Sequence, residues 1–321
     1  MKLLSRLFII VAAFSLLSTG TLRAQDAGGF PRTITDGAGN KVTIKTKPEH
    51  IVSATLGTDE ILFSLVDASR LAAVTANALD PQQSDVVEQA KQIQNHLTTV
   101  SPEIIIALHP DLVFVASYTD AGVVKQLRDA GLTVFLLGNF NNIKDIENNI
   151  TLVGQVVGDE AQAAKIVDDM ETRLKAIAEA IKGQKPLSVV YYLPQAYSYG
   201  PGTTIDDLII RAGGVNAVTA AGIKEAFPVL SDEFLVTQDP DFILLAGYNS
   251  YAPGFVDGFS KNPHFQTLKA VKNKHVVVVD DAHISAVSQY IVDGVSDVAA
   301  LLYPDVYQPT MNATEEATAA P

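Results

Sequence analysis

One eighteen-residue pattern occurs twice in this chain, and it limits the possible folds more than any other feature does. SPEIIIALHPDLVFVASY spans residues 101–118, SDEFLVTQDPDFILLAGY spans residues 231–248, and the two align without a gap. Each copy opens on a serine suited to cap a helix, reaches a Pro-Asp pair that ends the helix, and continues into an apolar run typical of a buried strand. The repeat therefore predicts two similar lobes, each with a helix, a tight turn and a buried strand.

The segments around the repeat alternate between strand and helix patterns. A Gly-rich turn separates two short β-type segments at 33–35 and 42–44, and a strand that ends at Ser53 precedes a helix expected over 58–65. Such alternation is typical of an α/β fold with mostly parallel sheets. In such sheets ligands bind beyond the carboxyl ends of the strands, so Tyr118 and Tyr248, which follow the two repeated strands, are candidate ligand contacts.

A long helix is predicted between the two copies. Its apolar positions recur at steps of three and four and so share one helical face: Val167, Met170, Leu174, Ile177 and Ile181. A helix of about 24 residues is on the order of 36 Å long, enough to run the length of a lobe and to limit hinge motion. We expect an N-terminal lobe over 25–158, a connecting helix over 159–183, a C-terminal lobe over 184–307 and a disordered tail over 308–321.

The first 24 residues have the layout of a cleavable secretory signal. Lys2 and Arg6 precede a mostly apolar run at 7–17, which is too short for a stable membrane anchor, and small residues follow near Ala24. An amphipathic N-terminal helix that is retained is the alternative. The chain contains no cysteine, so it lacks disulfides and the residue that carries a lipid anchor. We expect a freely diffusing periplasmic protein, although the same features fit a secreted one.

The composition excludes several functions. The formal charge is −13 and no Lys/Arg run stands out, so nucleic acid is not an expected partner. No Gly-x-Ser-x-Gly elbow, phosphate-binding loop or His-Glu-x-x-His motif occurs, so we expect neither enzymatic activity nor catalytic residues. The six histidines are scattered without a His-x-His pair, which argues against a bare metal site, and we expect no resident cofactor.

An ordered set of segments carries a family resemblance. It consists of RTITDGAGNKVTIKTKPEHIVS at 32–53, the two repeat copies, GPGTTIDDLIIRAGGVNAV at 200–218 and LKAVKNKHVVVVD at 268–280. With these segments the chain resembles periplasmic solute-binding proteins of the helical-backbone class, which serve ABC importers of metal chelates. The resemblance implies a monomer that captures a ferric siderophore, haem or cobalamin between its lobes and delivers it to a permease dimer in the inner membrane. An exported chelate-binding sensor or scavenger that does not dock, or an exported α/β enzyme, is the alternative.

The resemblance also assigns a role to one glutamate in each repeat copy. In that family one Glu on each lobe docks into a basic pocket of the permease, and the match places these roles on Glu103 and Glu233. The alternative is that each carboxylate only stabilises the first turn of its own helix through the helix dipole.

The expected ligand contacts are mostly tyrosines in the cleft loops that the resemblance implies. They are Tyr118, Tyr197, Tyr199, Tyr248 and Tyr251, together with Thr55 and His283. A tyrosine combines a flat apolar face with a hydroxyl, which suits a large chelate, but it also occurs wherever a core meets water. His283 is a candidate axial ligand of haem iron or a lone surface histidine. Tyr191 and Tyr192, on an expected strand, are assigned to the core.

Few cations are available for an anionic ligand. After residue 24 the chain has five arginines, none of them in the tyrosine-bearing loops, at Arg32, Arg70, Arg128, Arg173 and Arg211. Catecholate siderophores are therefore less expected than a neutral hydroxamate chelate, a corrinoid or haem. The sequence does not rank these three.

Overall fold

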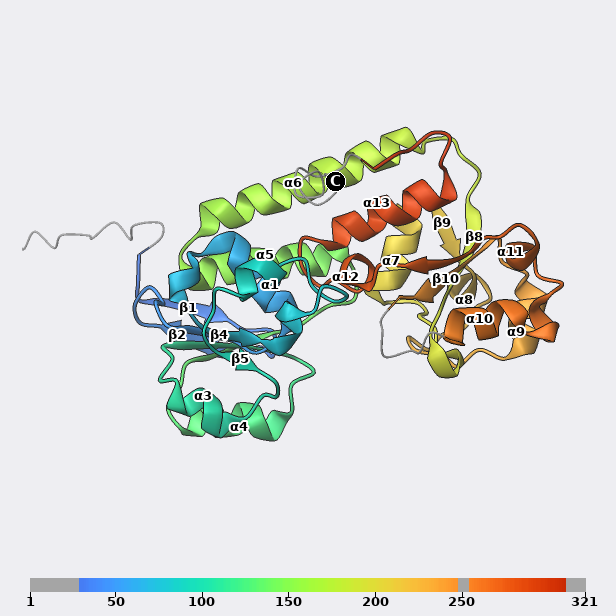
Figure 1. The fold of residues 1–321 in the computed structure, drawn as a ribbon. Helices are drawn as coiled ribbons and strands as arrows, with labels where there is room; N and C mark the ends of the chain where they lie inside the picture. Colours follow the sequence, from blue (N-terminus) through green and yellow to red (C-terminus); the bar gives the residue numbers. More distant parts are fainter. Residues whose placement is uncertain (1–28, 248–253, 310–321) are drawn as a thin grey trace, which may run out of the picture.

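The computed structural model describes residues 29–247 and 254–309, and these residues form two lobes. Each lobe contains a parallel β-sheet, and the long helix α6 (Glu160–Ala180) passes along one side of both (Figure 1). The prediction of an α/β fold with two similar lobes joined by a long helix is confirmed. Among the described residues, no helix is both long and apolar enough to cross a bilayer.

Four strands of each sheet follow the same order, β4-β3-β6-β7 in the first and β9-β8-β10-β11 in the second, and the first sheet has β5 as an additional edge strand. The first lobe has the order β5-β4-β3-β6-β7 and the second has β11-β10-β8-β9, with parallel pairing throughout. The strands of the first sheet are β3 (Ile51–Ser53), β4 (Leu71–Thr75), β5 (His96–Leu97), β6 (Leu112–Ala116) and β7 (Val134–Leu137). Those of the second are β8 (Leu187–Tyr192), β9 (Gly214–Asn216), β10 (Phe242–Ala246) and β11 (Val276–Val279). The expected hairpin forms from β1 (Arg32–Thr35) and β2 (Lys41–Ile44).

Helices cover both faces of each sheet. Those of the first lobe are α1 (Leu56–Leu65), α2 (Val87–Ala90), α3 (Pro102–Ala107), α4 (Ala121–Asp129) and α5 (Ile143–Val157), with 3-10 turns η1 (Ala68–Arg70) and η2 (Ala76–Leu79). Those after α6 are α7 (Thr204–Arg211), α8 (Ala217–Ala220), α9 (Asp232–Gln238), α10 (Gly254–Lys261), α11 (Lys269–Lys272), α12 (Asp281–Ile284) and α13 (Ile291–Leu302), with η3 (Pro194–Ala196) and η5 (Pro263–Phe265). Successive strand residues point to opposite faces, so Phe114 packs in one hydrophobic cluster and its neighbours Val113 and Val115 in another.

The repeated sequence builds the same local structure in both lobes. Ser101 and Ser231 cap α3 and α9, and each hydroxyl accepts a hydrogen bond from the backbone N–H three residues later. The aspartate of each Pro-Asp pair then ties the neighbouring strand in place. The Asp111 carboxylate accepts from the N–H of His50 at 3.1 Å, just before β3, and the Asp241 carboxylate accepts from the N–H of Ser188 in β8 at 2.9 Å. The repeat therefore sets the start of the adjacent strand in each sheet.

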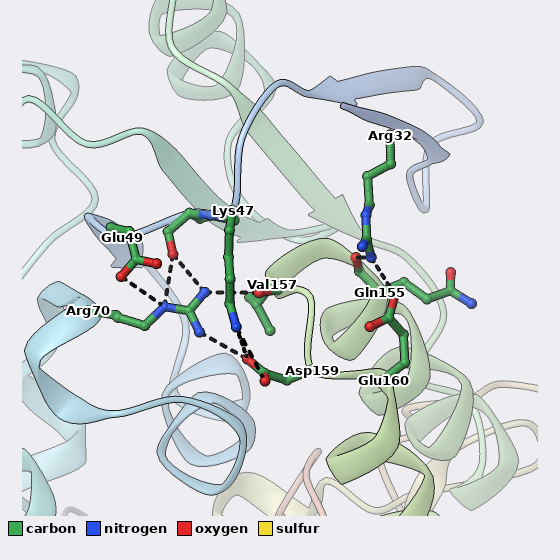
Figure 2. Close-up of polar contacts among 9 residues, drawn as sticks. Arg32, Lys47, Glu49, Arg70, Gln155, Val157, Asp159 and Glu160 are labelled. Carbon is green, nitrogen blue, oxygen red and sulfur yellow. Dashed lines mark hydrogen bonds and ion pairs between the residues drawn. The ribbon is translucent and has the colours of Figure 1, made fainter. Parts of the chain in front are cut away.

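The start of α6 is attached to the first lobe by a buried arginine. The guanidinium of Arg70 donates to the carbonyl oxygens of Pro48, at 2.6 and 2.8 Å, and of Val157, at 2.9 Å. It also pairs with the carboxylate of Asp159, the residue before α6, at 2.9 Å (Figure 2). Lys47 approaches the same carboxylate at 3.5 Å. Because the guanidinium is planar and carries five donors, it holds these groups in one fixed arrangement.

A second contact attaches the first turn of α6 to the hairpin. Arg32, in β1, forms an ion pair with Glu160 and donates to the backbone carbonyl of Gln155 in α5 (Figure 2). Further along, Arg173 of α6 pairs with Asp293 of α13 in the second lobe. The helix is thus held by both lobes.

The two lobes also share a hydrophobic core. A single cluster of buried side chains extends from Phe114 in the first sheet, through Met170 of α6, to Leu244 in the second sheet. Independent lobes joined by a flexible linker would have separate cores. The shared cluster means that wide separation of the lobes would expose apolar surface to water.

We expect Arg70→Met to lower the free energy of unfolding by about 2–3 kcal/mol. Removing one partner of a fully buried ion pair typically costs about 3–5 kcal/mol, and the loss is smaller here because Asp159 is partly exposed and keeps Lys47. Urea unfolding measures the change. Lys125→Met, which breaks an exposed pair with Asp129, is the control and should change stability by no more than about 0.5 kcal/mol. If Arg70→Met were as stable as the parent, the arginine would not be what holds α6.

Candidate functional site

Two cavities are lined by residues of both lobes and a third, next to them, by residues of the second lobe alone, and together we call them the inter-lobe cleft. Their volumes are about 340, 400 and 220 Å³, and Tyr199 lines all three. We call the 340 Å³ cavity the central cavity. The 400 Å³ cavity shares the lining residues Tyr118 and Val287 with it. The cleft is therefore continuous rather than a set of separate hollows.

The central cavity lies where the strands of both sheets end. Leu56 and Tyr118, which line it from the first lobe, follow β3 and β6. Leu193 follows β8 and Ala246 is the last residue of β10, and both line it from the second lobe. This is the position at which open parallel α/β sheets bind ligands.

Aromatic rings form much of the cleft wall. Tyr199 contacts the ring of Tyr191 with centroids 5.5 Å apart, and it contacts Phe227 edge to face, also at 5.5 Å. From the first lobe, Tyr118 packs against Phe140 at 5.9 Å. Tyr118 is 66% exposed and Phe227 is 64% exposed. Exposed rings on both sides of a cavity offer flat apolar surface to a bulky ligand.

The structure brings several of the predicted ligand contacts together. Tyr118 and Tyr199 line the central cavity from opposite lobes, and Tyr197 lines the 220 Å³ cavity with Tyr199. Thr55 is buried, caps α1 and is not among the residues that line the three cavities. The other two tyrosines, Tyr248 and Tyr251, lie outside the described residues.

His283 lies in a different environment from the tyrosines. Its Nδ1 contacts the carboxylate of Asp297 at 2.6 Å, and its Nε2 contacts Asp85 of the first lobe at 3.2 Å. Burial opposes the charged ring, but the two carboxylates outweigh it and raise the pKa of His283 to about 11. The ring is partly buried and is not among the residues that line the three cavities. In this structure His283 forms an ion pair that links the lobes.

The cavity wall includes residues that sequence reasoning did not select. Tyr191 was assigned to the core, and it is indeed 2% exposed, yet it also lines the central cavity because it is the next-to-last residue of β8. Its hydroxyl donates to Asp281, at the start of α12, at 2.6 Å. Asp281 lies two residues beyond β11, so the strand-end rule that pointed to Tyr118 applies equally to it.

Two acidic residues of α1 are buried beside the cleft. Asp59 accepts hydrogen bonds from the backbone N–H and the hydroxyl of Thr75, yet burial raises its pKa to about 7. Glu60, 1% exposed, lines the central cavity, and its Oε2 accepts from Ser288 of the second lobe at 2.6 Å. Burial raises the pKa of Glu60 to about 8, and the negative charge of Asp85 adds to the shift. The backbone N–H of Asp85 acts in the opposite direction and lowers the pKa, while Oε1 of Glu60 has no hydrogen-bond partner among the described residues.

The cleft is acidic and aromatic rather than basic. None of the described residues that line its three cavities is a Lys, Arg or His. Within the described part of the chain, no group of three or more His, Asp or Glu side chains is arranged to hold a metal ion. The lining side chains can therefore provide apolar contacts, hydroxyl groups and hydrogen-bond acceptors to a ligand.

Glu103 and Glu233 lie on the surface of their lobes. Both are exposed in the first turn of α3 and α9, and both helices lie on the side of their lobe away from α6 (Figure 1). The hydroxyl of Ser101 donates to Glu103 at 2.7 Å and lowers the pKa of that carboxyl group, which stays charged at neutral pH. Next to Glu233, Asp232 contacts His264 at 2.9 Å.

Comparison with known families identifies the type of protein. A sequence model described as periplasmic binding protein matches residues 51–282. The chain belongs to the periplasmic binding protein family. Its matched region begins at β3 and ends in α12, so it contains both sheets and most of the residues that line the cleft.

Similar proteins and a similar solved structure cover most of the chain. An uncharacterized ABC transporter substrate-binding lipoprotein of Bacillus subtilis (strain 168) is 29% identical over 87% of this chain and 88% of its own length. A cobalamin-binding protein of Halobacterium salinarum is 29% identical over 69% of this chain and 60% of its own length. The solved structure of a periplasmic heme-binding protein from Roseiflexus sp. RS-1, in apo form, has a TM-score of 0.70 and 25% identity and is covered over 98% of its length.

We expect Glu60→Gln to stabilise the protein above neutral pH. Between the ordinary pKa of 4.5 and the raised value of about 8, the folded state holds a proton that the unfolded chain has released. The stability of the parent therefore falls as pH rises through this window, and the glutamine variant lacks that loss. One unit of pKa difference is worth about 1.4 kcal/mol, so the variant should gain at least that much between pH 5 and pH 9.

Denaturant unfolding at a series of pH values measures this difference. Gln keeps an acceptor for Ser288, so the test isolates the proton. Glu88→Gln, at an exposed position on α2, is the matched control and should show no such trend. A difference between parent and Glu60→Gln that did not change with pH would contradict the raised pKa.

Proposed function

We propose that this protein is the extracytoplasmic substrate-binding component of an ABC importer. It captures a metal chelate, such as a ferric siderophore, haem or cobalamin, in the inter-lobe cleft and delivers it to the membrane permease. Binding is reversible, the protein acts as a monomer, and no reaction is catalysed. Residues 1–24 serve as a secretory signal, and the mature protein works in the periplasm.

The observation that carries this proposal is the aromatic cleft at the strand ends of two linked sheets. Tyr118 and Tyr199 supply ring surface from opposite lobes, and the adjoining cavities give room for a ligand larger than any one of them would hold. The named relatives support the same function, since they include an ABC transporter substrate-binding lipoprotein and a cobalamin-binding protein. Tyr197, Tyr248 and Tyr251 are proposed to extend this binding surface.

Permease docking through Glu103 and Glu233 is the second part of the proposal. Each is an exposed carboxylate at an equivalent place in the repeated unit, so a two-fold permease dimer would meet one on each lobe. The contact would place the cleft over the translocation path. A chelate-binding sensor or scavenger would bind the same ligand without needing either charge.

A ligand panel tests cargo binding. We expect one of haem, cobalamin, a ferric hydroxamate or a ferric catecholate to raise the thermal midpoint of the purified mature protein by several degrees. A ligand present at 100 times its dissociation constant adds about 2.7 kcal/mol to stability. A variant with Tyr118→Ala and Tyr199→Ala should lose most of the shift, whereas Tyr307→Phe, outside the cleft, should keep it. No shift with any chelate would contradict the proposed cargo class.

Charge reversal tests docking. We expect Glu103→Lys combined with Glu233→Lys to abolish uptake of labelled chelate by cells that carry the cognate permease, with ligand affinity unchanged. The control is Glu88→Lys with Asp305→Lys, which places the same charge change at one exposed site on each lobe. Normal uptake by the docking variant would favour the sensor or scavenger instead.

A further inference from the structure

The charge of the inter-lobe cleft is one-sided. The described residues that line its cavities include two acids and no basic side chain. Asp281 comes from the second lobe, and Glu60, whose raised pKa keeps it protonated at neutral pH, comes from the first. An anion in this cleft would lose hydration, and no basic side chain among the described lining residues would replace it.

Asp281 is held in a defined position at the cavity wall. The hydroxyl of Tyr191 donates to its Oδ1 at 2.6 Å, and the Tyr191 ring is itself fixed by burial and by contact with Tyr199. Burial, together with the Asp281 charge, raises the pKa of Tyr191, so this hydroxyl stays protonated and remains a donor. A fixed carboxylate is an acceptor only, and its natural partners are N–H groups and positive charges.

Glu60 adds to the same selectivity from the opposite lobe. Its carboxyl group is buried at the wall of the central cavity, and one of its oxygens has no hydrogen-bond partner among the described residues. A cationic group or an N–H donor in the central cavity would stabilise the ionised form of Glu60, and an anionic group would oppose it.

We propose that the cleft selects chelates without net negative charge, and that Asp281 determines this specificity by accepting from a positively charged or N–H-bearing group of the cargo. The inference rests on the proposed function, because it names the class of chelate that the importer carries. Chelates with free carboxylates or catecholates, haem with its two propionates among them, are disfavoured by the negative charge of Asp281, which narrows the proposed cargo to neutral and cationic chelates.

Pairs of ligands that share a scaffold and differ in charge provide the test. One pair is ferrioxamine B, which carries an ammonium group, and its N-acetyl derivative. The second is cyanocobalamin and the monocarboxylate made by hydrolysing one side-chain amide, and the third is the diamide of haem and haem itself. Dissociation constants are measured by calorimetry or by quenching of tyrosine fluorescence, at low and moderate salt.

In each ligand pair that binds the protein, we expect the member with the more positive net charge to bind at least tenfold more tightly than the other member. Asp281→Asn should reduce that preference at least fivefold, and Tyr191→Phe, which removes one hydrogen bond to the carboxylate, should reduce it by less. Asp305→Asn removes the same charge at an exposed site of the second lobe and should leave the preference unchanged. Thermal unfolding of each variant without ligand checks that it is folded.

The outcomes separate this inference from the proposed function. Equal or tighter binding of the more negative members would overturn the charge selectivity while leaving chelate transport in place. An unchanged preference in a folded Asp281→Asn protein would remove Asp281 from the mechanism. If no member of any pair bound, the proposed function would fall with the inference. If Asp281→Asn did not fold, the ligand pairs with the parent protein would still decide the charge class.

Discussion

The attachment of α6 to the first lobe by Arg70 is the constraint on which the cleft depends. A buried guanidinium joins the segment before β3, the end of α5 and the residue before α6 through hydrogen bonds of 2.6–2.9 Å. From that fixed start α6 reaches the second lobe, where Arg173 pairs with Asp293. Because the helix is held at both lobes and a hydrophobic cluster runs beneath it, the carboxyl edges of the two sheets stay facing each other.

The residue types in the cleft follow from this arrangement, in which the carboxyl ends of the strands of one sheet face those of the other. Strand interiors are apolar and their ends are where the chain turns, so polar and aromatic side chains gather at the two facing edges. Tyr118 comes from one edge, and Tyr191 with Asp281 comes from the other. Contacts across the gap, such as Ser288 with Glu60 and His283 with Asp85, then connect the lobes behind the cavity. The same arrangement buries acids that water would otherwise solvate.

Much of the local structure was predictable because it depends on neighbouring residues alone. The serine caps of α3 and α9, the turns at the Pro-Asp pairs and the apolar face of α6 were confirmed at the residues expected. Candidate tyrosines at strand ends were found by the same local rule, and Tyr118 reached the cavity wall. The aspartates of the repeat had a further role, tying adjacent strands, that no single segment shows.

The sequence by itself determined the approximate place of the main helices and strands, the duplication of the lobe and the family, since caps, periodicity and ordered motifs are carried by short segments. Only the tertiary structure decided the charge and protonation of the site. Glu60 meets Ser288, which lies 228 positions later, and its pKa depends on being buried there. Tyr191 is both core and cavity wall because a second sheet edge faces it. The burial of a side chain and its position facing the other lobe both arise from contacts between distant segments, and no local sequence pattern encodes them.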